Sequence, residues 1–543
     1  MDRRIAAFVL AAAFLAVAIP MPASGPFLRL SIVRLALFTA LAAAGLAILM
    51  IRGVRWEMAR TPLLAAALLG IGYVLGAGRS PAPATSLLGL AHKGSVLAIA
   101  MIVAVLASQE EGRRTLSRMA TLFLAVLALT ALIAGAIRGK IPLVGSLGHA
   151  NVLAYLIVVL VPLVEFSARK AQTRWEKWIA WGSVGLALLV VVLTLSAGAF
   201  LALAVGWGPT FLFSQDNRKR LATVLAAGAV AVAAISMGLL VKGREVAVTP
   251  RVQLIHAGVR AFAQAPVTGQ GVYSFLYRFP ELRTVDMQYF PDTCAQKPVD
   301  HVHFEPLHTA VESGAIGAAG LILLAGWLLL SAGRAARDRG LWGRTIWRMT
   351  AAAMVQGVVS LAPAREGSLA VAIVLGVVLA IPLKASRPLP RSLPALLALA
   401  LLASLPLQWK RISSDFALRQ GRDPNLYYGA RNVDALRKAA LLWPEDVEAP
   451  TLLTVTLYQR AMLPDTDPQV KVKLLDEALG WSRHVQRLSP QFFKEPILAA
   501  RILLALGDPA GALEELNRGD RFVTNREWLE LRVVVINSLK NSQ

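Results

Sequence analysis

Three histidines and two glutamates gather in the stretch from 298 to 317, around the start of an apolar run. His301 and His303 are two residues apart, so they share one side of an extended chain. His308 and Glu312 are four apart and share one face of the helix that is predicted to follow. A histidine that titrates near neutral pH can take a proton from an attacking hydroxyl, and a carboxylate can orient its ring. The spacing therefore predicts general-base chemistry.

Metal binding is an alternative for the same stretch, because Asp300 and Glu305 add carboxylates to the histidines. The ligands are not spaced like the His-Glu-x-x-His of zinc enzymes, so the sequence favours a site without metal. A structural alternative also stays open, in which a single histidine lies at a membrane interface and bonds to backbone. No metal and no cofactor is predicted.

Arginines suited to a phosphate group precede the histidines. Arg251 and Arg260 fall on a predicted amphipathic helix, which Pro266 ends. A guanidinium offers paired donors that match phosphate oxygens, so these residues suit a phosphate-bearing lipid head. The Gly269-x-Gly271 pair lacks the strand and helix of a nucleotide fingerprint and predicts a tight turn.

The composition predicts the elements that must position these residues. Hydrophobic residues make up 56% of the chain and charged residues 16%, a balance typical of an all-α, polytopic membrane protein. About 12 to 13 spans are expected from the length of the apolar runs. The predicted organisation is nine spans in 1–241, a loop in 242–308, four spans in 309–409 and a separate helical domain in 410–543. The ninth span is expected near 221–241.

Charge predicts the orientation of the spans. Lysines and arginines cluster on alternate loops, as in cytoplasmic loops near span ends. The N-terminus is therefore predicted to be cytoplasmic, and the 242–308 loop and the C-terminal domain are predicted to face the periplasm or the exterior. Most of the net charge of +23 lies in the short cytoplasmic loops, so nucleic-acid binding is not expected.

The tail after residue 410 alternates amphipathic, helix-length stretches with Pro or Gly-Asp-Pro breaks. It resembles a degenerate tetratricopeptide array, with small or turn-forming residues at about the repeat's offsets: Ala478, Pro490, Ala499, Gly507 and Ala512. Such arrays bind proteins or peptides, so a protein partner is one interpretation. A structural cap packed on the loop below is the other.

Three segments together resemble the O-antigen ligase and Wzy-type polymerase superfamily. The late signature of that family is matched by His303, Leu307, Glu312, Gly314, Ile316 and Gly317. Its loop opening is matched by Arg251, Pro266, Gly269 and Gly271, and its glycine-rich turn before a span by Gly145, Gly148, His149 and Asn151. The resemblance covers about residues 140 to 320, and the tail lies outside it.

The resemblance implies a GT-C-like, metal-independent glycosyltransferase that inverts the anomeric centre. Such an enzyme moves a glycan from undecaprenyl diphosphate to an acceptor hydroxyl on lipid A-core, another glycan or a protein. His303 would activate the hydroxyl, and Arg251 would offset charge on the departing diphosphate. The residues assigned to substrate binding are Arg260, Arg278, His301, His308, Glu312, Lys93 and Asn151.

The chain departs from the family pattern at two positions. Ala197 stands where members commonly carry an arginine, and Phe304 replaces the usual asparagine after the histidine. Lys93, inside the fourth predicted span, could replace the missing charge if it faces a cavity, or it could extend to the interface. A polysaccharide polymerase or protein ligase of the same fold, and a non-catalytic scaffold or transporter, are the alternative functions.

Overall fold

The fold was taken from a computed structural model of the full chain. It describes residues 2–18, 32–54, 56–138, 143, 149–212, 249–282, 299, 301–359, 368–381, 387–422, 432–490, 495–519 and 526–542. These residues are almost entirely helical, which confirms the predicted all-α class. The predicted span near 221–241 lies outside the described residues.

The helices of the first part are α1 (Asp2–Ala18), α2 (Ile32–Ile51), α3 (Arg60–Ala77), α4 (Pro83–Ala107), α5 (Glu110–Arg138), α6 (Ala150–Arg169), α7 (Arg174–Leu193), α8 (Ala197–Leu212), α11 (Thr249–Gln264), α12 (Phe275–Leu282), α14 (Glu305–Asp338), α15 (Gly340–Val359), α16 (Ser368–Leu379) and α17 (Ser392–Gly421). Two short strands, β1 (Glu57–Met58) and β2 (Arg387–Pro388), pair antiparallel. The C-terminal helices are α18 (Val433–Leu442), α19 (Glu448–Ala461), α20 (Pro468–Leu488), α21 (Glu495–Ala505), α22 (Pro509–Gly519) and α23 (Arg526–Ser542).

Eight of the described helices, α2 to α7, α14 and α17, are long and apolar enough to cross a membrane. Three shorter apolar segments lie in α1, α8 and α16. In α6 every residue from Val152 to Val164 is buried, so this helix is enclosed by its neighbours on all sides. The chain is therefore an integral membrane protein with a helix at its centre that has little contact with lipid.

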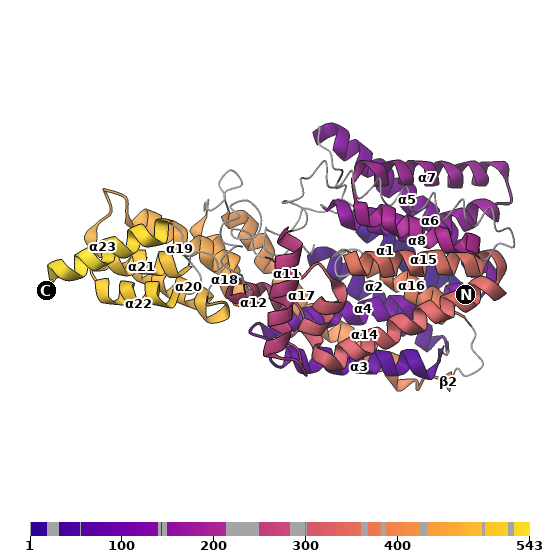
Figure 1. The fold of residues 1–543 in the computed structure, drawn as a ribbon, viewed down its shortest axis with the longest axis horizontal. Coiled ribbons are helices and arrows are strands. Elements are labelled where there is room, and N and C mark those ends of the chain that lie inside the picture. The colour runs from indigo at the N-terminus through magenta and orange to yellow at the C-terminus, as the bar shows by residue number, and fades with distance from the viewer. Residues whose placement is uncertain are drawn as a thin grey trace.

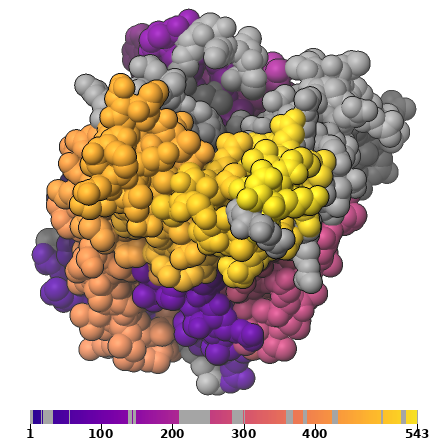
Figure 2. Space-filling model, turned by 90° about the vertical axis from the view of Figure 1, so that its left-hand side faces the viewer, coloured from indigo at the N-terminus to yellow at the C-terminus, as the bar shows by residue number. Residues whose placement is uncertain are grey.

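The apolar helices run along the long axis of the molecule, and the C-terminal helices stand beyond one end of them (Figure 1). Seen from that end, the orange-to-yellow C-terminal helices cover the middle of the face (Figure 2). α17 runs without interruption across the predicted domain boundary at 409/410. Its Leu401 belongs to the core of the apolar helices and its Leu418 to the core of the C-terminal ones. One continuous helix thus joins the two parts.

The opposite end of the apolar helices is rich in basic residues held in ion pairs. Arg118 of α5 pairs with Glu176 of α7 at 2.7 Å, and Arg348 of α15 pairs with Glu165 of α6. The guanidinium of Arg113 lies over the Trp342 ring, 5.3 Å from its centroid. These contacts link α5, α6, α7 and α15 at one end, so the basic clusters of the sequence meet in space.

α3 and α14 pack closely because small residues line their contact (Figure 1). A Cβ atom added at Gly72 would lie 2.6 Å from the carbonyl oxygen of Ser313, and one at Gly76 would lie 2.3 Å from that of Glu312. Small residues four apart allow helix backbones to approach in this way in membranes. The backbone of α3 therefore lies directly against the N-terminal half of α14.

α14 is interrupted at Gly314, whose φ of 66° and ψ of −168° are not helical. The interruption leaves backbone N–H and C=O groups of α14 without partners inside the helix. The turn after α11 forms hydrogen bonds with these groups. Gln270 N–H donates to Val311 O at 2.8 Å, Gly271 N–H to Glu312 O at 3.0 Å, and Ala315 N–H donates to Pro266 O at 2.7 Å. We call this contact between residues 266–271 and 311–315 the loop clasp. The Gly269-x-Gly271 segment is thus a tight turn, as predicted.

The C-terminal helices α18 to α23 pack each against the next around a core of leucine and alanine. Their starts follow from the sequence: Asn432 caps α18, and Asp467 caps α20 by accepting from the backbone N–H groups of Gln469 and Val470. A helical domain was predicted here. Its relation to tetratricopeptide repeats stays a prediction.

Gly314→Ala should destabilise the protein. Gly314 lies in a backbone region that is open almost only to glycine, and an L-residue there costs about 1–3 kcal/mol. The added Cβ would also lie 2.1 Å from the carbonyl oxygen of Val267. We expect a melting temperature several degrees lower in detergent. Gly326→Ala is the matched control on the same helix, because its Cβ would meet no atom within 4 Å. Equal melting temperatures for the two variants would show that the loop clasp does not need the break in α14.

Stability of the C-terminal domain should depend on pH through Glu495. Its carboxyl is buried and accepts from the hydroxyls of Thr451 at 2.7 Å and Ser482 at 2.6 Å. Burial raises its pKa to about 7, so the folded state favours the neutral form. The stability that it contributes is complete below the ordinary glutamate value and is lost as pH rises through 7.

Glu495→Gln should therefore raise the melting temperature of this domain at pH 8 and leave it nearly unchanged at pH 5. The gain at pH 8 is on the order of 3 kcal/mol. Glu477→Gln is the control, and it should lower the melting temperature at pH 8. Hydrogen bonds from Arg437 lower the pKa of Glu477, so its ionised form stabilises the fold. A Glu495→Gln melting temperature that shifts equally at both pH values would contradict the assignment.

Candidate functional site

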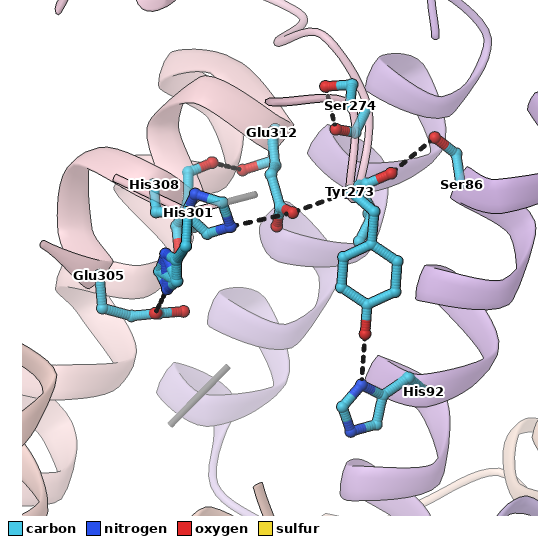
Figure 3. A network of polar contacts seen from close by, with 12 residues as sticks. Ser86, His92, Tyr273, Ser274, His301, Glu305, His308 and Glu312 are labelled. Atoms are coloured by element: carbon cyan, nitrogen blue, oxygen red, sulfur yellow. Dashed lines mark hydrogen bonds and ion pairs between the residues drawn. The ribbon is translucent and has the colours of Figure 1, made fainter. Parts of the chain in front are cut away.

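The predicted histidines meet where the loop clasp joins α14 to the turn after α11, at the end of the apolar helices that carries the C-terminal domain (Figure 3). His301 and His303 lie in the segment before α14, and His308 and Glu312 in its first two turns. His301, His308 and Glu312 are each at most 2% exposed. The chain thus encloses ionisable side chains at one end of an apolar bundle, where they are costly unless they are paired.

Glu312 connects the helix to the loop. Its Oε1 atom lies 3.2 Å from His308 Nε2 and accepts the backbone N–H of Tyr273 at 2.8 Å. The spacing of four residues predicted the first contact, which the structure confirms. The second contact depends on the loop clasp, which brings Tyr273 beside α14. Glu312 therefore orients a histidine and also anchors the turn that follows Gly271.

A second carboxylate orients His301. Its Nε2 atom lies 3.1 Å from Glu305 Oε2, and its ring lies 3.7 Å from the ring of His308, measured between centroids. His303 is next to it, with ring centroids 6.1 Å apart and planes at 28°. The three imidazoles therefore form one cluster, and the side that His301 and His303 were predicted to share is real.

His303 differs from the other two histidines in backbone and exposure. Its φ of 62° lies in the left-handed region, which only a few per cent of non-glycine residues adopt, although histidine does so more often than most. Its side chain is half-buried, whereas His301 and His308 are buried. Within the cluster it is thus the imidazole that an incoming substrate reaches most easily. Strained backbone of this kind is often found where a side chain must point in one direction.

Tyr273 extends the cluster toward α4 and α16. Its φ is 61°, and its hydroxyl is hydrogen-bonded to His92 Nδ1 at 2.7 Å. His92 Nε2 is in turn hydrogen-bonded to the Ser368 hydroxyl at 2.9 Å. His92 is 4% exposed and has partners on both ring nitrogens. His92 is therefore a buried bridge between Tyr273 and Ser368.

Lys93 supplies the positive charge beside the cluster. Its ammonium lies 5.4 Å from the centroid of the Tyr73 ring, and it interacts electrostatically with Glu305 and Glu312. The sequence left open whether Lys93 faces a cavity or extends to the interface. Lys93 is therefore within electrostatic reach of Glu305 and Glu312, where a cation offsets part of the cost of burying negative charge.

The other residues assigned to substrate binding lie on α6, α11 and α12. Arg260 is exposed on α11, and Asn151 lies in the first turn of α6. Arg278 of α12 is 3.9 Å from Glu281, a long ion pair. Arg251 lies in the first turn of α11, and its side chain is outside the described part of the structure. Asp300 and Arg283 are outside it as well.

Sequence reasoning missed Tyr273, Tyr73 and Ser368. Tyr273 follows the Gly269-x-Gly271 turn by two residues, and that proximity was the only available signal. Tyr73 and Ser368 lie far away in the chain and reach the site through helix packing. Tyr155 of α6 was missed too: its side chain is fully buried, and its hydroxyl has no hydrogen-bond partner among the described residues.

The arrangement can move protons and can hold an anion. Paired carboxylates orient two imidazoles, a third imidazole is accessible, and one ammonium lies alongside. Among the described residues, no three histidine, cysteine, aspartate or glutamate side chains converge as metal ligands. The chemistry that these groups can perform themselves is the transfer of a proton from a hydroxyl while negative charge develops nearby.

Comparison with protein families agrees with this geometry. Residues 182–322 match the family described as O-antigen ligase, about a quarter of the chain. The match runs from α7 through the described parts of α8, α11 and α12 to the interrupted half of α14. No curated protein matches the chain. The family implies glycosyl transfer of ligase or polymerase type, with a lipid-linked glycan and a glycan acceptor as substrates in general. This match over residues 182–322 supports the predicted resemblance to the O-antigen ligase and Wzy-type polymerase superfamily.

Proposed function

We propose that the protein transfers a glycan from undecaprenyl diphosphate to an acceptor hydroxyl, on the periplasmic face of the bacterial inner membrane. The observation that carries the proposal is the carboxylate-oriented histidine cluster at one end of a membrane-spanning bundle, inside the segment that matches the O-antigen ligase family. A lipid carrier delivers its diphosphate at the membrane surface, which is where this cluster lies.

The basic residues support the periplasmic face. Arginines of α5, α14 and α15 gather at the end opposite the histidine cluster, and cytoplasmic ends of spans keep the positive charge. The cluster and the C-terminal domain are then both periplasmic.

In the proposed reaction, the half-buried His303 takes the proton of the acceptor hydroxyl. The hydroxyl oxygen attacks the anomeric carbon as the bond from that carbon to the diphosphate oxygen breaks, so the anomeric centre inverts. Arg251, with Arg260, offsets the charge on the departing diphosphate. Two features support the role of His303: it is the accessible imidazole of the cluster, and its backbone is held in the left-handed region.

The missing arginine at Ala197 leaves a place for another cation. Ala197 begins α8, two residues after Leu195, whose φ is 51°. Lys93 is the cation with recorded interactions at the carboxylates of the cluster. We propose that Lys93 keeps positive charge at the site and steadies Glu305 and Glu312 in their ionised forms. Arg278 is the second candidate, since it lies on α12 a few residues beyond Tyr273.

The acceptor distinguishes the related alternatives. A ligase for lipid A-core, a polysaccharide polymerase and a protein ligase would share this chemistry and differ in the hydroxyl that attacks. The C-terminal helices lie at the end of the molecule where the acceptor arrives, which favours an acceptor that they contact (Figure 2). A panel of acceptors separates these functions.

Glycan transfer in reconstituted membranes should collapse in His303→Ala and Arg251→Ala. Losing a general base typically costs about 10²–10⁴-fold in rate, and losing a charge-stabilising donor about 10²–10³-fold. The native rate should survive a chelator. His256→Ala is the matched control, because His256 is exposed on α11 outside the cluster. Absence of product with every donor and acceptor would favour a scaffold or transporter instead.

Lys93→Met should lower both the transfer rate and the melting temperature, whereas Lys93→Arg should keep part of each. Lys93 is half-buried and interacts electrostatically with Glu305 and Glu312, so removing its charge leaves these carboxylates less compensated. Lys177→Met, at the basic end on α7, is the matched control. Native activity in Lys93→Met would exclude Lys93 as the replacement for the missing arginine.

A further inference from the structure

The turn between α18 and α19, residues 443–448, joins the C-terminal domain to the membrane part. It touches α4, which carries His92 and Lys93, and α12, which follows Tyr273. It also touches α17, the helix that links the two parts of the chain. We call this segment the 443–448 turn. Its contacts bear directly on the geometry of the histidine cluster.

Glu445 of this turn caps α4. Its Oε1 atom accepts the backbone N–H of Ala84 at 2.8 Å, and its Oε2 atom accepts that of Thr85 at 2.6 Å. The residue at the N-cap position of α4, Ala82, makes no side-chain cap. The first free N–H groups of a helix need an acceptor, and a carboxylate also interacts favourably with the positive end of the helix dipole. The C-terminal domain supplies both, from 360 residues away along the chain.

Tyr277 of α12 is held by the same domain at both ends. Its hydroxyl donates to the backbone carbonyl of Glu445 at 2.8 Å, and its own carbonyl accepts from the Ser489 hydroxyl at 2.7 Å. The side chain is 2% exposed and packs in a small apolar cluster with Val447 and Val485. α12 is thus fixed between the membrane helices and the C-terminal helices.

Buried ion pairs hold the 443–448 turn itself. Arg411 of α17 lies 3.2 Å from Asp446, with both side chains 3% exposed, and Arg422 lies 3.0 Å from Glu448. The guanidinium of Arg411 also lies 5.6 Å from the centroid of the Trp443 ring. Because α17 continues from the membrane part, these contacts give the turn a fixed position relative to α4 and α12.

α4 and the segment that precedes α12 both carry residues of the site. His92 comes eight residues after Ala84 on α4, about 12 Å along the helix. Tyr273 comes four residues before Tyr277, and Ser86 of α4 donates to Val272 O at 2.7 Å. His92 and Tyr273 are hydrogen-bonded to each other, and Tyr273 N–H donates to Glu312. A shift of the first turn of α4 or of α12 would therefore move the partners of Glu312.

We propose that Glu445 and Tyr277 are positioning residues, through which the C-terminal domain holds α4 and the 271–277 segment in the geometry that the histidine cluster requires. The domain is then part of the catalytic architecture, whatever partner it also binds. The part of this inference that concerns the transfer rate rests on the proposed glycosyl transfer. The part that concerns the position of α4 and of the 271–277 segment does not.

The test compares the full-length protein with Glu445→Ala and Glu445→Gln in detergent or reconstituted membranes. Backbone hydrogen exchange is measured over 84–92 and 271–277, and the transfer rate is measured with undecaprenyl diphosphate-linked glycan as donor. Asp467→Ala is the matched control, because Asp467 is also a carboxylate cap in the same domain, at α20, away from the membrane part.

We expect Glu445→Ala to speed exchange in both segments and to lower kcat about tenfold, with KM changed less than twofold, because misplaced catalytic groups slow chemistry. Glu445→Gln should restore part of both properties, since its amide oxygen still accepts one N–H. Asp467→Ala should leave both segments and kcat at native values.

Faster exchange confined to residues 84 and 85, or a kcat drop no larger than that of Asp467→Ala, would overturn the proposal. If the native protein transfers no glycan, the proposed function fails and the exchange measurement still decides the structural half. Faster exchange of Glu445→Ala in residues 271–277 then supports positioning by the C-terminal domain. Faster exchange only in the first turn of α4 contradicts it.

Discussion

The site depends on one constraint, the need to satisfy backbone groups inside an apolar bundle. In a membrane environment an N–H or C=O without a partner costs several kcal/mol, so a helix there is rarely interrupted. α14 is interrupted at Gly314, and the turn at 266–271 takes up the freed groups at 2.7 to 3.0 Å. The same contact carries Tyr273 to Glu312. A break in a helix thus becomes the means of attaching a loop to it.

Electrostatic pairing explains why the cluster can be buried. Glu305 and Glu312 each lie within about 3 Å of an imidazole nitrogen, and Lys93 balances part of their charge. The Glu312 contact also orients the His308 ring, because a carboxylate that accepts from one nitrogen sets the tautomer at the other. His303 remains the accessible member. The cluster therefore combines a fixed, buried half with a half that substrate can approach.

The C-terminal domain contributes to this arrangement from outside the membrane part. It reaches the apolar helices through a capping carboxylate, a buried tyrosine and the continuous helix α17. These are directional contacts with small tolerance in distance, unlike a flexible tether. These contacts connect the position of the C-terminal domain to the residues next to Glu312.

Local pattern determined the class of this protein, because apolar length, loop charge and helical spacing act over a few residues. The all-α membrane fold, the separate C-terminal helices and the His308–Glu312 contact all followed from such spacing. Tertiary structure alone decided that Tyr273 bridges Glu312 and His92, that Lys93 lies beside the carboxylates, and that Glu445 caps α4. Those partners are separated by up to 361 residues, and only helix packing brings them together. Spacing along the chain carries no information about distances of that kind.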